Sequence, residues 1–138
     1  MHTMKLPFLI ATLLLIALLA VSPVGAKPNP FVGVWVSTDT DGSNQRLTVG
    51  GGPGNAHNVR YYDDGATVCG LDPVTGDFLS AARARGRLSA SGTTLSGDLD
   101  LYCLTSPPEF NGTYFLVFEY DASTDTLTDG FGVVWSRR

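Results

Sequence analysis

Few of the residues that carry common enzyme chemistry occur in this chain of 138 residues, which has two histidines and two cysteines. Only His57 follows the N-terminal hydrophobic run, so a cluster of histidines around a metal is excluded. No Gly-x-Ser-x-Gly, His-Glu-x-x-His or phosphate-loop pattern is present, which removes the familiar motifs of hydrolases and nucleotide-binding proteins. An enzyme would therefore depend on His57, and we favour a protein without catalytic activity or cofactor.

Positive charge is also scarce. Nine Lys and Arg residues stand against 13 Asp and Glu residues, a formal net charge of −4. Removal of the N-terminal segment that contains Lys5 would bring the net charge to about −5. An acidic chain of this kind is not expected to bind nucleic acid or anionic lipid.

A long hydrophobic run occurs only at the N-terminus, where residues 6–21 (LPFLIATLLLIALLAV) follow Lys5. Small side chains at Val24 and Ala26 then occupy the third and first positions before a cleavage site. We predict a signal peptide over residues 1–26 and a single mature domain over residues 27–138. The protein is expected to be secreted, extracellular or periplasmic, with no membrane attachment after cleavage.

The two cysteines, Cys69 and Cys103, form an even set behind a signal peptide, which predicts a disulfide bond. The alternative is a metal site or a catalytic thiol. That alternative has little support, because the cysteines lack Cys-x-x-Cys spacing and a paired histidine.

The mature chain has no helical apolar period, and short runs of Val, Thr, Tyr, Phe and Leu alternate with Gly, Asp-Gly and Ser-Gly turns. This pattern predicts an all-β domain. We expect strands at residues 31–37, 45–49, 58–62, 66–70, 78–88, 95–104, 113–120 and 126–136, the last with a bulge at Gly130. Eight consecutive strands favour an antiparallel up-and-down β-barrel.

The Ser91-Gly92 pair predicts a hairpin whose register decides how to interpret the arginine run at positions 83, 85 and 87. A two-residue loop there places Arg83 opposite Asp100 and Arg85 opposite Asp98. Cross-strand pairing on a solvated face then explains the arginines better than an anion-binding site does. The same register places Ala84 opposite Leu99 on the inner face.

Small residues on that inner face, among them Ala82 and Ala84, have two interpretations. They either let the opposite wall of the barrel come close or leave a cavity, and an eight-stranded barrel is compatible with both.

Gly33-Val34-Trp35 near the start and the terminal Arg137 and Arg138 resemble the lipocalin group of secreted β-barrels. This resemblance implies that Trp35 packs across one barrel end and that Arg137 or Arg138 covers its ring, a cation-π contact that closes the barrel. These roles are structural.

Two other small barrels are similar to parts of the sequence. Residues 33–43 resemble the opening of avidin-like barrels, which implies a ligand contact for Ser43, although the later tryptophans of that family are missing and biotin is not expected. Secreted bacterial inhibitors of proteases or lysozyme are also disulfide-bonded barrels of this size.

Asp39, Asp41 and Ser43 place oxygen atoms at alternate positions, as short calcium loops do. Asp121 and Asp125 form a similar acidic turn in the last hairpin. A turn rich in Asp and Gly is the better interpretation, and we predict no metal. If the first and last strands are neighbours, we expect the two turns at the same barrel end, and a shared calcium ion is then the alternative to test.

Two strands are apolar on both faces: the segment from Phe115 to Tyr120, and Val133 to Trp135. Such strands are covered by another chain or form a binding patch, so they are the candidate surfaces for an oligomer or a protein partner.

We favour a secreted, non-catalytic protein that binds a small apolar or amphipathic ligand inside the barrel. The alternative is a protein-interaction module, an enzyme inhibitor or a cell-surface accessory protein. The predicted ligand-binding residues are Trp35, Ser43, Tyr61, Ala82, Ala84, Leu99, Phe118 and Trp135.

Overall fold

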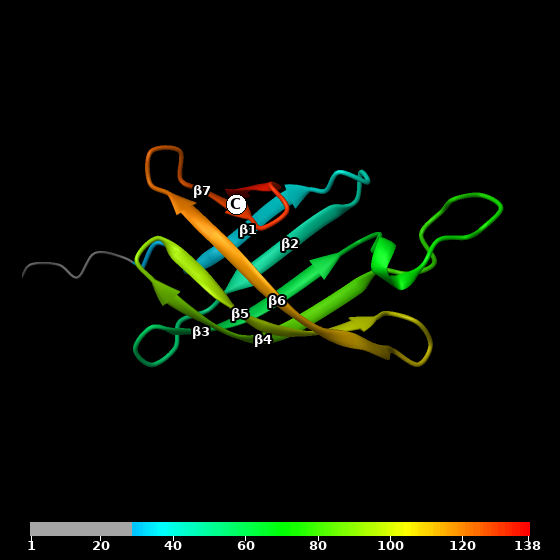
Figure 1. Cartoon of the computed structure of the whole chain (residues 1–138), viewed down its shortest axis with the longest axis horizontal. Helices are drawn as coiled ribbons and strands as arrows, with labels where there is room; N and C mark the ends of the chain where they lie inside the picture. The colour runs from blue at the N-terminus through cyan, green and yellow to red at the C-terminus, as the bar shows by residue number, and fades with distance from the viewer. Residues whose placement is uncertain (1–28) are drawn as a thin grey trace, which may run out of the picture.

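The computed structural model describes residues 29–138, so the predicted signal peptide lies outside the described residues (Figure 1). The elements in chain order are β1 (Gly33–Thr38), β2 (Asn44–Val49), β3 (Ala56–Asp63), the 3-10 helix η1 (Thr67–Cys69), β4 (Ala82–Ser91), β5 (Thr94–Cys103), β6 (Glu109–Asp121), β7 (Thr126–Asp129) and β8 (Val134–Arg137). Within residues 29–138, no helix is long and apolar enough to cross a membrane.

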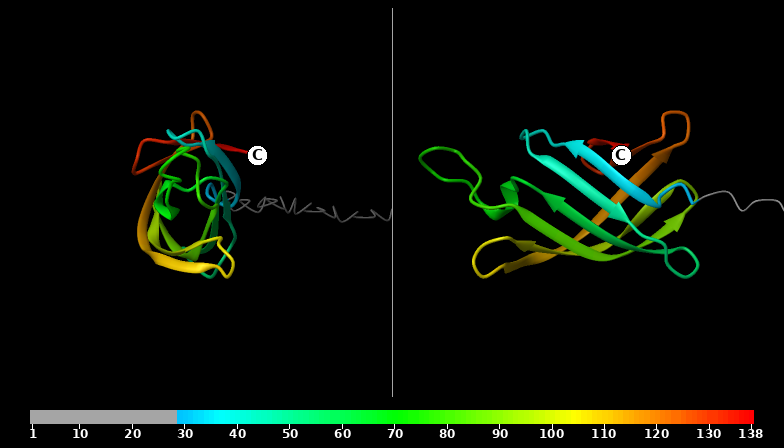
Figure 2. Two further views of the ribbon diagram at one scale, coloured as in Figure 1. Left: turned by 90° about the vertical axis from the view of Figure 1, so that its right-hand side faces the viewer. Right: turned by 180° about the vertical axis from the view of Figure 1, so that it is seen from behind.

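The eight strands form a closed antiparallel barrel in which each strand pairs with the next one along the chain. Closure is made by β8 pairing with β1, where Trp35 lies opposite Arg137 and Val36 opposite Ser136. The left view of Figure 2 shows the strands arranged as a ring. The predicted fold class, an eight-stranded up-and-down barrel with one disulfide, is confirmed.

The disulfide joins Cys69 to Cys103, as predicted, with a Cα–Cα distance of 5.6 Å. Cys69 is the last residue of η1 and Cys103 the last residue of β5. The bond therefore ties the long connection between β3 and β4 to the barrel wall. Part of this connection projects beyond the barrel end, as the green loop of Figure 2 shows.

Two of the predicted strands are wrong, although the number eight is right. Residues 66–70 form a single 3-10 turn, in which the Cys69 amide donates to the Ala66 carbonyl and Gly70 has a φ of +98°. The predicted last strand is two strands, β7 and β8, because residues 130–133 reverse the chain. The Asp129 carboxylate accepts the amides of Phe131 and Val133, which stabilises this hairpin turn in place of a bulge.

The β4–β5 hairpin turns one residue later than predicted, with Gly92 and Thr93 in the loop and Ser91 opposite Thr94. Gly92 has a φ of +60°, which suits it to this tight turn. The register is therefore shifted by two residues, and the predicted Arg83–Asp100 and Arg85–Asp98 pairs are wrong. Arg85 lies opposite Asp100, and its guanidinium stands 5.6 Å from the centroid of the Tyr102 ring.

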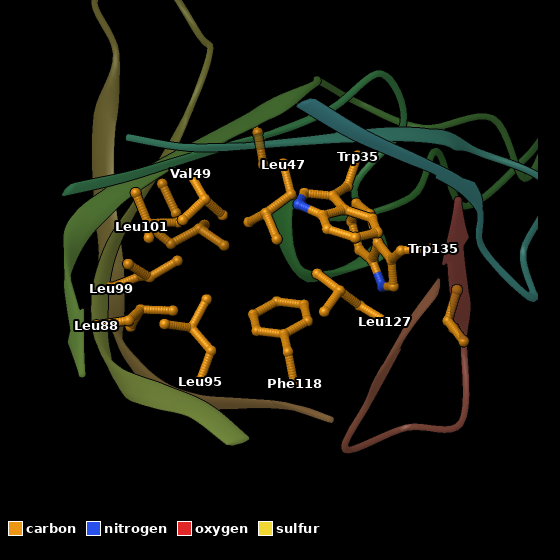
Figure 3. Close-up of a cluster of buried hydrophobic side chains, with 14 of the residues drawn as sticks. Trp35, Leu47, Val49, Leu88, Leu95, Leu99, Leu101, Phe118, Leu127 and Trp135 are labelled. Carbon is orange, nitrogen blue, oxygen red and sulfur yellow. The ribbon is translucent and has the colours of Figure 1, made fainter. Parts of the chain in front are cut away.

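A shift of two residues keeps each side chain on its predicted face, because side chains alternate along a strand. The inner faces supply one apolar core that includes both tryptophans (Figure 3). Its largest fully buried members are Phe31, Trp35, Leu47, Leu88, Leu95, Leu99, Phe118, Leu127 and Trp135.

The barrel wall is incomplete beside β6. This strand pairs with β5 from Glu109 to Glu119, but with β7 only from Phe118 to Asp121. The first half of β6 therefore has a strand partner on one side alone.

Candidate functional site

An interior cavity of about 340 Å³ lies at the end of the barrel where β1, β3 and β7 finish. Apolar and aromatic side chains form most of its wall, and aspartates and threonines form its rim. The lining residues are Asp39, Thr40, Asp41, Gln45, Tyr61, Asp63, Ala66, Thr67, Val68, Ala82, Ala84, Leu99, Leu101, Tyr114, Leu116, Phe118, Asp129, Phe131, Val133 and Trp135.

The hollow exists because β4 presents small side chains to the interior. Ala82 and Ala84 are both buried and both line the cavity. Gly86, two residues further on, serves a different purpose: a Cβ there would lie 2.3 Å from the Asp98 carbonyl oxygen and 2.9 Å from the Leu99 side chain. Of the two predicted outcomes, the cavity is found at the alanines, whereas the close approach at Gly86 is made by the neighbouring strand β5 and not by the opposite wall.

The opposite end of the barrel is filled and closed. The Arg137 guanidinium carbon lies 4.1 Å from the centroid of the Trp35 ring, in the arrangement that the lipocalin resemblance implies. Arg137 also donates to the carbonyl oxygens of Pro30 and Val32, and makes a salt bridge of 2.8 Å with Asp125. Its guanidinium holds the pKa of the Asp125 carboxyl below the ordinary value.

Trp135 separates this filled end from the cavity. Its ring packs edge-on against Phe118 at 5.9 Å and near Tyr61 at 6.1 Å, and it lines the cavity. The indole Nε1 donates to Asp129 at 3.1 Å. Trp35 does not line the cavity, because its indole Nε1 donates to the Phe31 carbonyl at the closed end.

Asp63 is the most buried carboxylate of the rim, with 4% of its surface exposed. It accepts hydrogen bonds from the Tyr61 hydroxyl at 3.0 Å, the Gly65 amide at 3.1 Å and the Gln45 amide nitrogen at 3.5 Å. The same nitrogen of Gln45 donates to Asp39 at 2.9 Å, so one side chain bridges two carboxylates.

The pKa of the Tyr61 hydroxyl is affected by burial and by the negative charges of the site. Burial raises the pKa of its hydroxyl well above the ordinary value, and the negative charges of Asp63, Asp39 and Asp129 raise it further. The hydroxyl is therefore a neutral hydrogen-bond donor at all physiological pH values.

Six of the eight predicted ligand-binding residues line the cavity: Tyr61, Ala82, Ala84, Leu99, Phe118 and Trp135. Trp35 and Ser43 do not. Ser43 is buried beside the rim, where its hydroxyl and amide both donate to Asp41 and complete the turn after β1. Ligand binding itself stays a prediction.

The sequence interpretation missed the acidic rim. Asp39, Asp63 and Asp129 each stand at or just past the end of an odd-numbered strand. Odd-numbered strands of an up-and-down barrel run in the same direction, so their last residues gather at one end. This rule could have located the acidic rim from the sequence, but only if the strands had been numbered correctly.

The two acidic turns considered for calcium lie at opposite ends of the barrel, so the shared site is wrong. Residues 39–43 follow the end of β1, whereas Asp125 contacts Arg137, which lies beside the first half of β1. No three acidic, histidine or cysteine side chains within residues 29–138 are grouped so that they could hold a metal ion.

His57 is buried at the filled end, where its ring packs against Phe31. Its Nδ1 lies 3.2 Å from the Gly50 carbonyl, which can only accept, so Nδ1 donates there. Nε2 then accepts from the Asn29 amide at 3.2 Å. Both ring nitrogens are thus committed to structural hydrogen bonds, away from the cavity.

Buried and exposed side chains alternate along the two strands that were predicted to be apolar on both faces. In β6, Phe118 points into the core while Phe115 is exposed, and around β8, Val133 and Trp135 are buried while Val134 is exposed. Whether these outer apolar residues meet another chain stays a prediction.

Comparisons with protein-family models, with curated proteins and with solved structures give no match.

Proposed function

We propose that this barrel is a secreted, non-catalytic carrier that binds a small apolar or amphipathic molecule in its interior cavity. The observation that supports the proposal is the cavity itself, about 340 Å³ with a wall of apolar and aromatic side chains. Cavities that bind small molecules typically measure about 300–1,000 Å³ and combine an apolar wall with a few polar groups.

The energetics of the hollow support this proposal. A cavity inside a core costs about 24 cal/mol per Å³, so an empty void of this size would cost roughly 8 kcal/mol, comparable to the stability of a whole domain. Because the cavity reaches the rim, water can enter and lower that cost. A ligand that replaces this water along Ala84 and Leu99 would gain the hydrophobic free energy that the folded chain leaves unused.

The closed end supports a lipocalin-like arrangement in particular. In that group a first-strand tryptophan packs across one end of the barrel and a late arginine covers its ring. Here Trp35 and Arg137 form such a contact, and the cavity lies at the other end.

A protein partner is the second candidate function, and exposed apolar loop residues favour it. Val74, in the projecting loop, and Phe131, at the cavity rim, have 91% and 84% of their surfaces exposed. Apolar side chains this exposed at loop tips are typical of contact sites.

Binding of N-phenyl-1-naphthylamine, a neutral probe whose fluorescence rises in apolar surroundings, tests the cavity. Ala84→Phe fills the hollow, and Ala122→Phe adds the same ring to an exposed turn at the closed end. We expect Ala84→Phe to abolish probe binding and Ala122→Phe to leave it unchanged, with melting temperature and circular dichroism as checks of the fold. Equal probe affinity in both variants and the parent protein would refute the proposal.

A second measurement identifies the occupant. The protein purified from its own host is examined by native mass spectrometry, which distinguishes a retained small molecule from a bound protein chain. A small molecule supports the carrier function, and a protein partner without a small molecule supports the second candidate.

A further inference from the structure

The charged residues that line the cavity all have the same sign. Four aspartates contribute to it, and no lysine, arginine or histidine does. Within residues 29–138 the one salt bridge joins Arg137 to Asp125 at the closed end of the barrel. The carboxylates of the rim therefore have no cationic partner in the described chain.

Asp63 shows the consequence most clearly. It is almost fully buried, yet its hydrogen-bond donors are a tyrosine hydroxyl, a side-chain amide and a backbone amide, all of them neutral. Neutral donors satisfy the oxygen atoms but leave the charge in place, and a buried charge is costly without a counter-charge. Burial is the main cause of the raised pKa of Tyr61, and the negative charges of Asp63, Asp39 and Asp129 raise it further.

The strand register separates the polar and apolar parts of the cavity by depth. The row at the rim contains Asp63 opposite Ala82. The next row inward contains Tyr61 opposite Ala84, and Ala84 opposite Leu101. The third row contains Leu99 opposite Gly86. A ligand that fills the cavity thus meets carboxylates at its outer end and apolar side chains further in.

The outer part of the cavity also contains aromatic rings. Tyr61 and Trp135 lie beside Asp63 and Asp129, to which they donate hydrogen bonds, and Phe131 stands at the rim. Aromatic faces together with carboxylates suit an organic cation, whose charge is spread over several atoms. A compact metal ion fits poorly, because no three acidic, histidine or cysteine side chains in the described part of the chain could hold one.

We infer that the ligand is a cationic amphiphile, in which an amine or quaternary ammonium group lies among Asp39, Asp63 and Asp129 and an apolar body lies against Ala84 and Leu99. This inference rests on the proposed carrier function and adds the charge of the ligand to it. The test must therefore separate occupancy of the cavity from preference for charge.

Three probes with the same eight-carbon chain make that separation: octyltrimethylammonium, octan-1-ol and octanoate. Their affinities are measured by displacement of N-phenyl-1-naphthylamine at low ionic strength. We expect octyltrimethylammonium to bind at least about tenfold more tightly than octan-1-ol, and octanoate to bind most weakly. Added salt should reduce the difference in affinity between octyltrimethylammonium and octanoate, because the rim is open to solvent.

Charge removal at the rim provides the matched variants. Asp63→Asn and Asp39→Asn each keep one of the two oxygens that accept native hydrogen bonds and place an amide nitrogen at the other. Each should weaken octyltrimethylammonium binding about tenfold while leaving octan-1-ol within about twofold. Asp98→Asn removes the same charge from the outer surface of β5 and should change neither affinity. Asp39 is less buried than Asp63, so it remains informative if Asp63→Asn does not fold.

The outcomes distinguish the two proposals. If octan-1-ol binds as tightly as octyltrimethylammonium, or if Asp98→Asn has the same effect as Asp39→Asn, the inference about charge is overturned and the carrier function stands. If none of the three probes displaces the dye and Ala84→Phe has no effect on dye fluorescence, both proposals are overturned.

Discussion

Removal of the disulfide should cost the fold a large part of its stability, and the structure gives the expected size of the loss. The perturbation is the double substitution Cys69→Ala and Cys103→Ala, which avoids a free thiol. The two cysteines are separated by 34 positions, and the bond attaches η1 to the end of β5. The chain between them contains the projecting loop and all of β4, so the bond constrains a long stretch of the unfolded chain.

The magnitude follows from the entropy of closing this loop. The chain-entropy relation gives about 3 kcal/mol for 15 residues and about 4.7 kcal/mol for 100, so a loop of this length corresponds to about 4 kcal/mol. A domain of this size has a total stability of about 5–15 kcal/mol. The variant should therefore remain folded at room temperature but with a clearly reduced margin.

Urea unfolding followed by tryptophan fluorescence measures the loss. With a slope of about 1.5 kcal/mol per M, the midpoint should fall by roughly 2–3 M. The slope itself should rise, because an unfolded chain without the cross-link exposes more surface. A loss below about 1 kcal/mol with an unchanged slope would refute the entropic reasoning.

The same variant links the disulfide to the cavity. Ala66, Thr67 and Val68 line the rim, and the Thr67 hydroxyl donates to Asp41. Without the bond to Cys103, we expect faster hydrogen exchange over residues 64–81 than in β4 and β5, together with weaker binding of N-phenyl-1-naphthylamine. Uniform exchange across these segments would show that the rim does not depend on the disulfide.

Three further predictions concern Arg137, Asp125 and the tryptophans. Arg137→Lys should lower the melting temperature by several degrees, about 4 °C for each kcal/mol lost, because lysine cannot reach Asp125 and two carbonyl oxygens together, whereas Arg138→Lys should leave it unchanged. The lowered pKa of Asp125 means that its contribution to stability is complete above the ordinary value of 3.8 and is lost as the pH falls through the folded value. The difference in melting temperature between the parent protein and Asp125→Asn, present at pH 6, should therefore shrink as the pH falls below 3.8. Trp135→Phe should abolish the change in intrinsic fluorescence on ligand binding, because Trp135 lines the cavity and Trp35 does not; a retained change would place the ligand elsewhere.

The barrel was predictable because alternation and turn composition are local properties of the sequence. The error at residues 66–70 has a physical cause: Ala, Thr, Val and Cys suit a strand by composition, but the disulfide and the hydrogen bond from the Ala66 amide to the Ser80 carbonyl hold this segment as a turn. A tertiary constraint of this kind leaves no local pattern in the sequence.

That single error also explains the wrong calcium hypothesis. With an extra strand before it, the strand that ends at Tyr120 receives an odd number, and its turn falls at the same end as the turn after β1. As β6, it is even-numbered and ends beside Arg137 instead. The inner face of β4 was predicted correctly despite a shifted hairpin, because a shift of two residues preserves the face on which Ala82 and Ala84 lie.

The position of Trp135 divides the barrel into a part that stabilises the fold and a part that is free to bind. On the side of the closed end, Tyr120 packs against Phe31 and Trp35, and Arg137 covers the Trp35 ring. Substitutions there open a cavity or expose a charge. On the side of the cavity, Ala82 and Ala84 face unfilled space, so larger side chains there cause little steric clash. Because the two parts occupy opposite ends of the same strands, the ligand preference of this barrel can change by substitution at the rim and on β4 without weakening the contacts that close it.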